Sequence, residues 1–561
     1  MMERNKLIIK NGLVYDPIND IEGEKKDILI ESGKIVDKFT NRKDIKEIDA
    51  NGKTVIPSAI DIHTHVASQQ VNWVRLLGSD NAKFQEIWRG LTLENIAKDY
   101  IHMGYSFILE ANVFPSLAKQ TILNFQQLPV LDKAMLLNIS NLWPLELEFQ
   151  RGKINDIAIF LSDLLSKTCG FGFKVYNPFE CESWDFKKLR EDVSEKGRLY
   201  NFSALDVYEN IVKGVESLGL PHSAHVHIEG YENEIGKKNL FTVLERIRSL
   251  DLAPNQQTNS NLKRNQILHL AHVNAYANDG NNEALINFLN ENQNFTVDLA
   301  FVAFNDINPI VTSDRRLIQY LLTEDALENH NKLISSAVEF EGDSFISIRS
   351  FNKKNYQDCI LWANALDLAL NVKDKNQMCF SLNFPNYGNI KNIPEIASWL
   401  ISKEARNNFM KNMNKDFLRN NSLNNIDRSL SFSDFIRISR VSPAISLGLG
   451  NIKGNLSIET DADINILDIN VQEIDVSKDY EDLKRALSNI DYVIKSGNIV
   501  KKQNNIDLST QGFIFWSRGK AEIEGKKLTI SRKEEFYKKY ASMFYKSYSS
   551  SVDQAILREI D

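Results

Sequence analysis

Val55-Ile56-Pro57, followed closely by Asp61-Ile62-His63-Thr64-His65, is the most informative segment of this sequence. In an extended strand residues i and i+2 point to the same face, so His63 and His65 can bind one metal ion side by side. Imidazole nitrogen is a good ligand for zinc and similar ions. An isolated His-x-His pair can equally be a pair of surface or structural histidines. Its position at the end of a strand that follows a β-rich segment favours a metal site.

Five of the other histidines are also clustered at the ends of predicted strands. The chain has nine histidines, and those of the second and third clusters close two successive strands: His222, His225, His227, His269 and His272. His225 and His227 share one face, so we expect one to bind metal while the other binds substrate or orients a ligand. For His222, His269, His102 and His330 we favour structural hydrogen bonds.

Residues 57–440 alternate between apolar, strand-like runs and longer helical stretches. Strands separated by helices pair in parallel. At this length the pattern predicts an α/β fold, a (β/α)8 barrel of the TIM type, with its chemistry on the loops that follow the strands. The predicted strands include residues 106–110, 171–176, 223–227, 267–272, 295–299 and 378–382.

Both ends of the chain are predicted to be β-rich. Asn11-Gly12, Ser32-Gly33 and Ser496-Gly497 lie between apolar runs, a pattern typical of hairpins. Each end alone is too small to bury an apolar face. We therefore expect residues 1–56 and 441–561 to form one composite β-sandwich domain beside the barrel domain of residues 57–440. The alternative is two independent β modules.

Composition argues against several classes of protein. The net charge of −7 over 561 residues gives no support for binding to nucleic acid or to anionic lipid. The four cysteines form no Cys-x-x-Cys pair, as expected for a reducing compartment. The N-terminus has no signal-peptide core, and no run reaches the roughly 18 apolar residues that span a bilayer. We expect a cytoplasmic protein without a membrane partner.

Lys174 lies in the apolar run 171–176. A lysine in such a strand normally extends its amine to water at the rim. The alternative is an amine desolvated enough to stay neutral and to react with carbon dioxide as a carbamate. A carbamate is a carboxylate on a long arm, able to bridge two metal ions, and two bridged cations activate water and polarise an amide carbonyl.

These motifs resemble the amidohydrolase superfamily. The more specific resemblance is to the A subunits of formylmethanofuran dehydrogenase and of the related formyltransferase/hydrolase complex, and it runs from about residue 6 to about residue 516. It is carried by Val71-Asn72 with Arg75, by residues 102–105 and 110–111, by Lys174-Val175-Tyr176-Asn177-Pro178, and by residues 221–227 and 268–273.

The resemblance implies a binuclear zinc site bridged by carboxylated Lys174. Its other implied ligands are His63, His65, one of His225 and His227, and His272. It implies interconversion of formyl-methanofuran, or of a similar formylated amine, with formate plus the free amine. The implied partners are this small-molecule formyl carrier and the other subunits of a multi-subunit one-carbon transfer complex. We place Asn72, Arg75, Asn177 and Asn274 on the substrate side of the site.

The sequence departs from the family where an aspartate is expected after the last barrel strand. Asn383 and Phe384 stand there, and an asparagine amide cannot take a proton at neutral pH. Three hypotheses follow. Another group, such as His227 or Asp298, replaces the missing base beside Asn383; or the chain is a catalytically degenerate scaffold; or it is another cyclic amidohydrolase, similar to dihydropyrimidinase or dihydroorotase.

Overall fold

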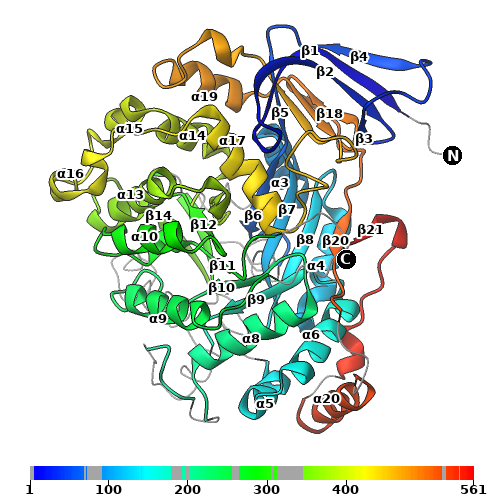
Figure 1. The fold of residues 1–561 in the computed structure, drawn as a ribbon, viewed down its shortest axis with the longest axis vertical. Coiled ribbons are helices and arrows are strands. Elements are labelled where there is room, and N and C mark those ends of the chain that lie inside the picture. Colours follow the sequence, from blue (N-terminus) through cyan, green and yellow to red (C-terminus); the bar gives the residue numbers. More distant parts are fainter. Residues whose placement is uncertain are drawn as a thin grey trace.

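The structure is a computed structural model, and its centre is a barrel of eight parallel strands (Figure 1). It describes residues 5–68, 71, 91–140, 142–178, 192–197, 201–254, 264–304, 307–312, 345–520, 526–541 and 544–560. The predicted (β/α)8 fold is confirmed. In barrel order the strands are β6 (Ala59–Thr64), β7 (Tyr105–Val113), β8 (Asp132–Asn138), β9 (Gly172–Tyr176), β10 (Ala224–His227), β11 (Leu268–Leu270), β12 (Phe295–Ala300) and β15 (Met378–Ser381).

Helices follow the strands and cover the outside of the barrel (Figure 1). Strands buried on both faces read as continuous apolar runs, and every residue of these eight strands is buried. The helices that follow them are α3 (Leu93–His102), α4 (Ala118–Gln127), α5 (Trp143–Arg151), α6 (Ile154–Thr168), α8 (Ala204–Leu218), α9 (Gly236–Arg248), α10 (Glu283–Glu291), α13 (Tyr356–Asn371) and α14 (Ile393–Ile401).

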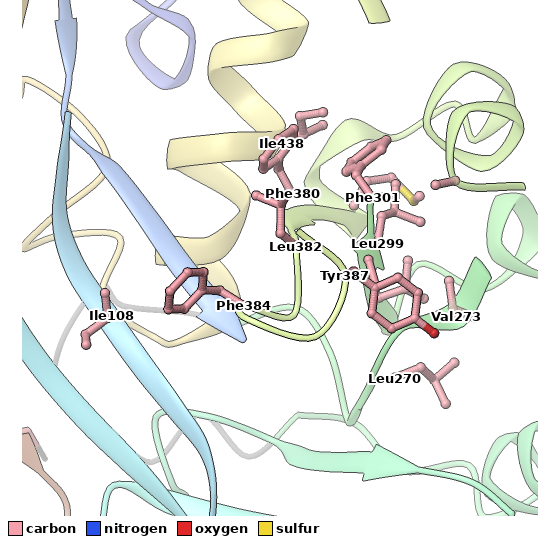
Figure 2. Packing of buried hydrophobic residues seen from close by; sticks show 14 of the residues in the cluster. Ile108, Leu270, Val273, Leu299, Phe301, Phe380, Leu382, Phe384, Tyr387 and Ile438 are labelled. Carbon is pink, nitrogen blue, oxygen red and sulfur yellow. The ribbon is translucent and has the colours of Figure 1, made fainter. Parts of the chain in front are cut away.

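The first and last barrel strands meet through the segment that carries the unexpected asparagine. Thr64 at the end of β6 forms a parallel bridge with Phe384, and the His65 amide donates to the Phe384 carbonyl over 2.7 Å. A hairpin of β13 (Ile307–Thr312) and β14 (Phe345–Ser350) is inserted between β12 and β15. Figure 2 shows the loop after β15 directing Phe384 towards Ile108 and Tyr387 towards Val273.

Strands from both chain ends share one mixed sheet. It contains β1 (Lys6–Asp16), β2 (Ile21–Glu31), β3 (Lys34–Val36), β4 (Ile45–Asp49) and β5 (Thr54–Pro57) from the first end, and β16 (Ile464–Leu467), β17 (Tyr492–Lys495), β18 (Asn498–Lys502) and β19 (Asn505–Ile506) from the second. Antiparallel pairing of β5 with β16 joins the two halves. The domain limits given above stay a prediction.

The turns of this sheet test the three predicted hairpins. Ser32-Gly33 connects β2 to β3, and Ser496-Gly497 connects β17 to β18, as predicted. The Asn11-Gly12 prediction is wrong, because Asn11 with φ 60° lies in a register shift inside the continuous strand β1. A bulge accepts the same left-handed residue as a turn.

The last part of the chain returns to the barrel. Strands β20 (Ile514–Trp516) and β21 (Leu557–Glu559) extend the barrel sheet beside β8, and helix α20 (Lys526–Tyr540) packs against α6. Within the described residues, no helix combines the length and apolar character needed to cross a bilayer.

Candidate metal centre

Two histidines stand at the end of the first barrel strand. His63 lies inside β6 near its end and His65 directly follows the strand; both are buried. Their ring centroids lie 5.5 Å apart. His65 Nδ1 lies 3.3 Å from Glu110 Oε1, whereas His63 Nδ1 lies 2.9 Å from Asp298 Oδ2. The two imidazole rings therefore contact different carboxylates, His63 that of Asp298 and His65 that of Glu110.

Lys174 on β9 lies beside the histidines of β10. It is in register with His225, and the whole side chain is buried. His225 Nε2 approaches His63 Nδ1 to 3.1 Å, and the His227 ring lies 5.1 Å from the ring of His272. The predicted ligands thus come together from four strands in the centre of the barrel.

Asp298 on β12 lies at the centre of this cluster. Its Oδ2 is 2.9 Å from His63 Nδ1, 3.5 Å from His225 Nε2 and 3.3 Å from His269 Nε2. Its Oδ1 accepts the backbone N–H of His272 over 2.8 Å. Ligand atoms of His63, His225 and Asp298 all lie within 4.8 Å of one another, a spacing that suits one metal ion.

Burial sets the charges of the cluster. It lowers the pKa of His63 and His225 well below the usual value, with Lys174 adding to the effect, so both imidazoles are neutral. Burial also lowers the pKa of Lys174 to about 7, which leaves a large fraction of its amine uncharged at neutral pH. Burial raises the pKa of Asp298, but the surrounding histidines outweigh it and hold this pKa well below its usual range.

The donor set fits a divalent metal. His63 Nε2 and His227 Nε2 are buried and have no hydrogen-bond partner among the described residues. His272 Nδ1 likewise has no hydrogen-bond partner among them and lies 3.6 Å from Asp298 Oδ1. Buried polar atoms are normally satisfied, and neutral imidazole nitrogens beside a carboxylate and an uncharged lysine suit zinc. The residues present could hold one ion between β6, β10 and β12.

Asn383 follows β15 and belongs to the turn that closes the barrel. Its φ of 45° is one that asparagine tolerates, and its backbone N–H donates to the Ser381 hydroxyl over 3.1 Å. Its side-chain Oδ1 accepts from Asn386 over 3.3 Å. Ser381 also donates to the His63 carbonyl over 2.8 Å. The asparagine is thus tied to the strand that carries the first metal-site histidine.

The predicted substrate residues fall in three different situations. Asn177 follows β9 with φ 40°, and its N–H donates to the His227 carbonyl over 3.3 Å, so it lies at the rim of the cluster. Asn274 donates to the carbonyls of Ala300 and Leu361 and accepts from the Ala300 N–H, which commits its amide to the main chain. Asn72 and Arg75 lie outside the described residues.

Three buried residues near the cluster are absent from the predicted site. Glu110 at the end of the 106–110 run receives four hydrogen bonds, including that of His65. Asp61 accepts from Tyr100 over 2.8 Å, and its Oδ1 lies 3.1 Å from the Ser381 hydroxyl. His269, predicted to have a structural role, bonds to Thr296 over 2.8 Å and also approaches Asp298. A carboxylate at a predicted strand end is the signal that could have found Glu110.

The sequence matches one protein-family model and is similar to two relatives over most of its length. Residues 373–501 match the model of the Amidohydrolase family. Protein FwdA of Methanocaldococcus jannaschii is 28% identical over 518 residues, covering 89% of this chain and 88% of that one. The A subunit of the formyltransferase/hydrolase complex Fhc of Methylorubrum extorquens is 24% identical over 537 residues, covering 91% and 90%.

Two further similarities concern a short segment and the whole fold. Dihydroorotase of Aquifex aeolicus is 51% identical over 63 residues, 11% of this chain and 15% of that one. The crystal structure of the complex FhcABCD from Methylorubrum extorquens with methylofuran contains a chain that superposes with a TM-score of 0.84 at 21% identity, covering 99% of both chains. At this identity the superposition establishes a shared fold.

Proposed function

We propose that this chain is an amidohydrolase that acts on the C–N bond of a formamide. It is similar over most of its length to protein FwdA and to the A subunit of the formyltransferase/hydrolase complex, and residues 373–501 match the Amidohydrolase family model. The substrate proposed is formyl-methanofuran or a similar formylated furan amine, interconverted with formate and the free amine. The chain would do this within a multi-subunit complex, with the other subunits as its partners.

The observation that carries the proposal is the convergence of Lys174, the strand-end histidines and Asp298 on one buried point. A buried lysine with a pKa of about 7 is suited to carboxylation, because its neutral amine is the form that reacts with carbon dioxide. His63, His65, His225, His227 and His272 would hold zinc with it. Bound divalent ions there supply polarisation of the formyl carbonyl and a water of lowered pKa.

The proton chemistry is assigned to Asp298. It is the described carboxylate that contacts the histidine cluster from β12, and it is ionised because the histidines hold its pKa low. Asp298 would accept a proton from the attacking water and then return that proton to the leaving amine. In this proposal Asp298 performs the task that Asn383 cannot, with His227 as the other candidate base.

The presence of asparagine at position 383 favours a second candidate function, that of a scaffold subunit without catalytic activity. A positioned general base contributes roughly 10²–10⁴-fold to rate, so a chain lacking one and without a substitute would be nearly inert. A third function, that of another cyclic amidohydrolase, has support only from the short dihydroorotase match, which covers 11% of this chain.

The test is hydrolysis of formylated furan amines by the purified, zinc-loaded protein, alone and with its partner subunits. We expect formate release that falls by about 10²–10⁴-fold in Asp298→Asn, which keeps an oxygen for the His272 N–H but removes the base. A matched control is Asp279→Asn, an exposed aspartate paired with Lys237. If Asp298→Asn leaves formate release unchanged, Asp298 is not the base. If the wild type releases no formate even in its full complex, the scaffold function is favoured.

A further inference from the structure

Glu110 is a buried carboxylate near the carboxyl end of β7, beside the His-x-His strand. Its Oε2 accepts three successive backbone N–H groups, from Val66 over 2.7 Å, Ala67 over 2.7 Å and Ser68 over 3.0 Å. Its Oε1 faces His65 Nδ1 at 3.3 Å. One carboxylate thus holds both the segment that follows the metal-site pair and one ring of that pair.

These contacts determine which ring nitrogen of His65 carries the proton. A carboxylate only accepts hydrogen bonds, so His65 Nδ1 must donate to it. In a neutral imidazole the other nitrogen, Nε2, then keeps its lone pair free, which is the form that binds a metal. The backbone N–H of His65 is held separately, by the Phe384 carbonyl at 2.7 Å, so the residue is fixed at two points.

We propose that Glu110 is a positioning residue that fixes His65 in its Nδ1-protonated tautomer and so prepares Nε2 as a metal ligand. The proposal rests on the metal site proposed above, but the tautomer itself is a property of the metal-free protein. It assigns to strand β7 a part in the site, although β7 supplies none of the proposed ligands.

Glu110→Gln separates the two tasks of this carboxylate. The glutamine oxygen must face Val66, Ala67 and Ser68, because turning the NH₂ group towards three N–H donors would leave all of them unsatisfied. The NH₂ group then points at His65 Nδ1 and donates to it. His65 is forced to carry its proton on Nε2, so the variant keeps the backbone contacts while reversing the tautomer.

The experiment measures tautomer and metal affinity together. Histidine-selective ¹⁵N NMR of the metal-free protein, with the His65 signal assigned through His65→Gln, should show Nδ1–H in the wild type and Nε2–H in Glu110→Gln. Chelator competition should show zinc affinity about 10–100-fold weaker in Glu110→Gln. Glu110→Asp, which keeps the charge, should recover the wild-type tautomer and part of the affinity.

Glu216→Gln is the matched control, because Glu216 is also a buried glutamate, paired with Arg264 rather than with a histidine. It should leave the His65 tautomer and zinc affinity unchanged. A wild-type His65 protonated on Nε2, or wild-type zinc affinity in Glu110→Gln, would overturn the proposal. Zinc that binds nowhere near His65 in a wild type with the expected tautomer would instead overturn the metal site, and only the control of the tautomer by Glu110 would stand.

Discussion

Lys174 lies in the wall of the barrel, next to His225 and close to Asp298, with its amine removed from water. A second lysine in the barrel, Lys133 on β8, is equally buried, and burial also lowers its pKa to about 7. The amine of Lys133, however, donates to the carbonyls of Leu128 and Gly512. The two lysines differ in their partners, and for this reason we propose the metal chemistry for Lys174 and not for Lys133.

Lys174→Ala should remove bound metal, since it deletes the proposed bridge, and His63→Ala should do the same by deleting a ligand. Elemental analysis of each purified variant measures the effect. Lys133→Met is the control, because Lys133 is also buried but its amine bonds to main-chain carbonyls and not to the histidine cluster. This variant should retain the metal content of the wild type. Full metal occupancy in both Lys174→Ala and His63→Ala would refute the assigned ligands.

Asn383→Asp should raise the rate of formyl hydrolysis. Aspartate also tolerates the φ of 45° at this position, and its backbone N–H would still donate to Ser381, so folding should be little changed. The new carboxylate would add a proton acceptor beside the strand that holds His63. Formate release under saturating substrate is the measurement. A hydrolysis rate equal to that of the wild type would mean that the rate is already determined by the fit of the substrate against Phe384 or by Asp298 as the base.

Sequence reasoning can group the histidines and Lys174 because each stands at the end of an apolar run. It cannot place Asp298 at their centre, because the distance between β12 and β6 depends on closure of the whole barrel. The resemblance assigns Asn274 to the substrate side, but its side-chain amide bonds to main-chain groups of Ala300. No local sequence pattern predicts these contacts.

At the scale of elements, the alternation of strands with helices is sufficient to predict the barrel. Strand β8 is not among the predicted strands, because its ends, Asp132-Lys133 and Asn138, are polar. The Asn11-Gly12 hairpin fails for the opposite reason: the local signal is strong, but β1 continues through it to pair with β2, β4 and β5. Long-range pairing overrides the turn preference.

Asn274→Ala should destabilise the protein while leaving its metal content unchanged. Asn274 ties the turn after β11 to β12 and α13 through Ala300 and Leu361. Removing its amide leaves buried main-chain groups of Ala300 without a partner, at a cost of about 1–3 kcal/mol each. Calorimetric unfolding gives the loss of stability and substrate titration gives KM. A raised KM with unchanged stability would instead support the predicted substrate contact.

At the scale of the whole molecule, a buried charge cluster joins the barrel to the terminal sheet. The Lys453 ammonium lies 2.6 Å from Asp132 on β8, 3.0 Å from Asp461 and 2.6 Å from Asp463. Arg558 on the returning strand β21 also reaches Asp461, at 2.6 Å. The three carboxylates are spaced like metal ligands, but a lysine of the same chain occupies their centre.

Lys453→Met should lower the free energy of unfolding by about 3–5 kcal/mol, because it leaves buried carboxylates without their main counter-charge. Burial raises the pKa of Asp461, but Lys453 and Arg558 outweigh it and hold it low, so this contribution is full above about pH 4 and is lost as the pH falls. Calorimetry from pH 7 down to acid should show the smaller acid dependence in the variant.

Exposed Lys478, paired with Asp475, provides the control for that variant. Lys478→Met should leave the free energy of unfolding almost unchanged, because water and salt screen an ion pair at the surface. If Lys453→Met is equally mild, the cluster does not hold the barrel and the terminal sheet together.

The central claim is that the histidines, Lys174 and Asp298 form a metal centre inside the barrel. Metal per chain, measured by elemental analysis after growth with ample zinc and carbon dioxide, tests it most directly. We predict about two zinc ions per chain, the number that a carboxylated lysine bridge would hold. A protein that is folded but carries no metal under these conditions would contradict the claim and would favour the scaffold role.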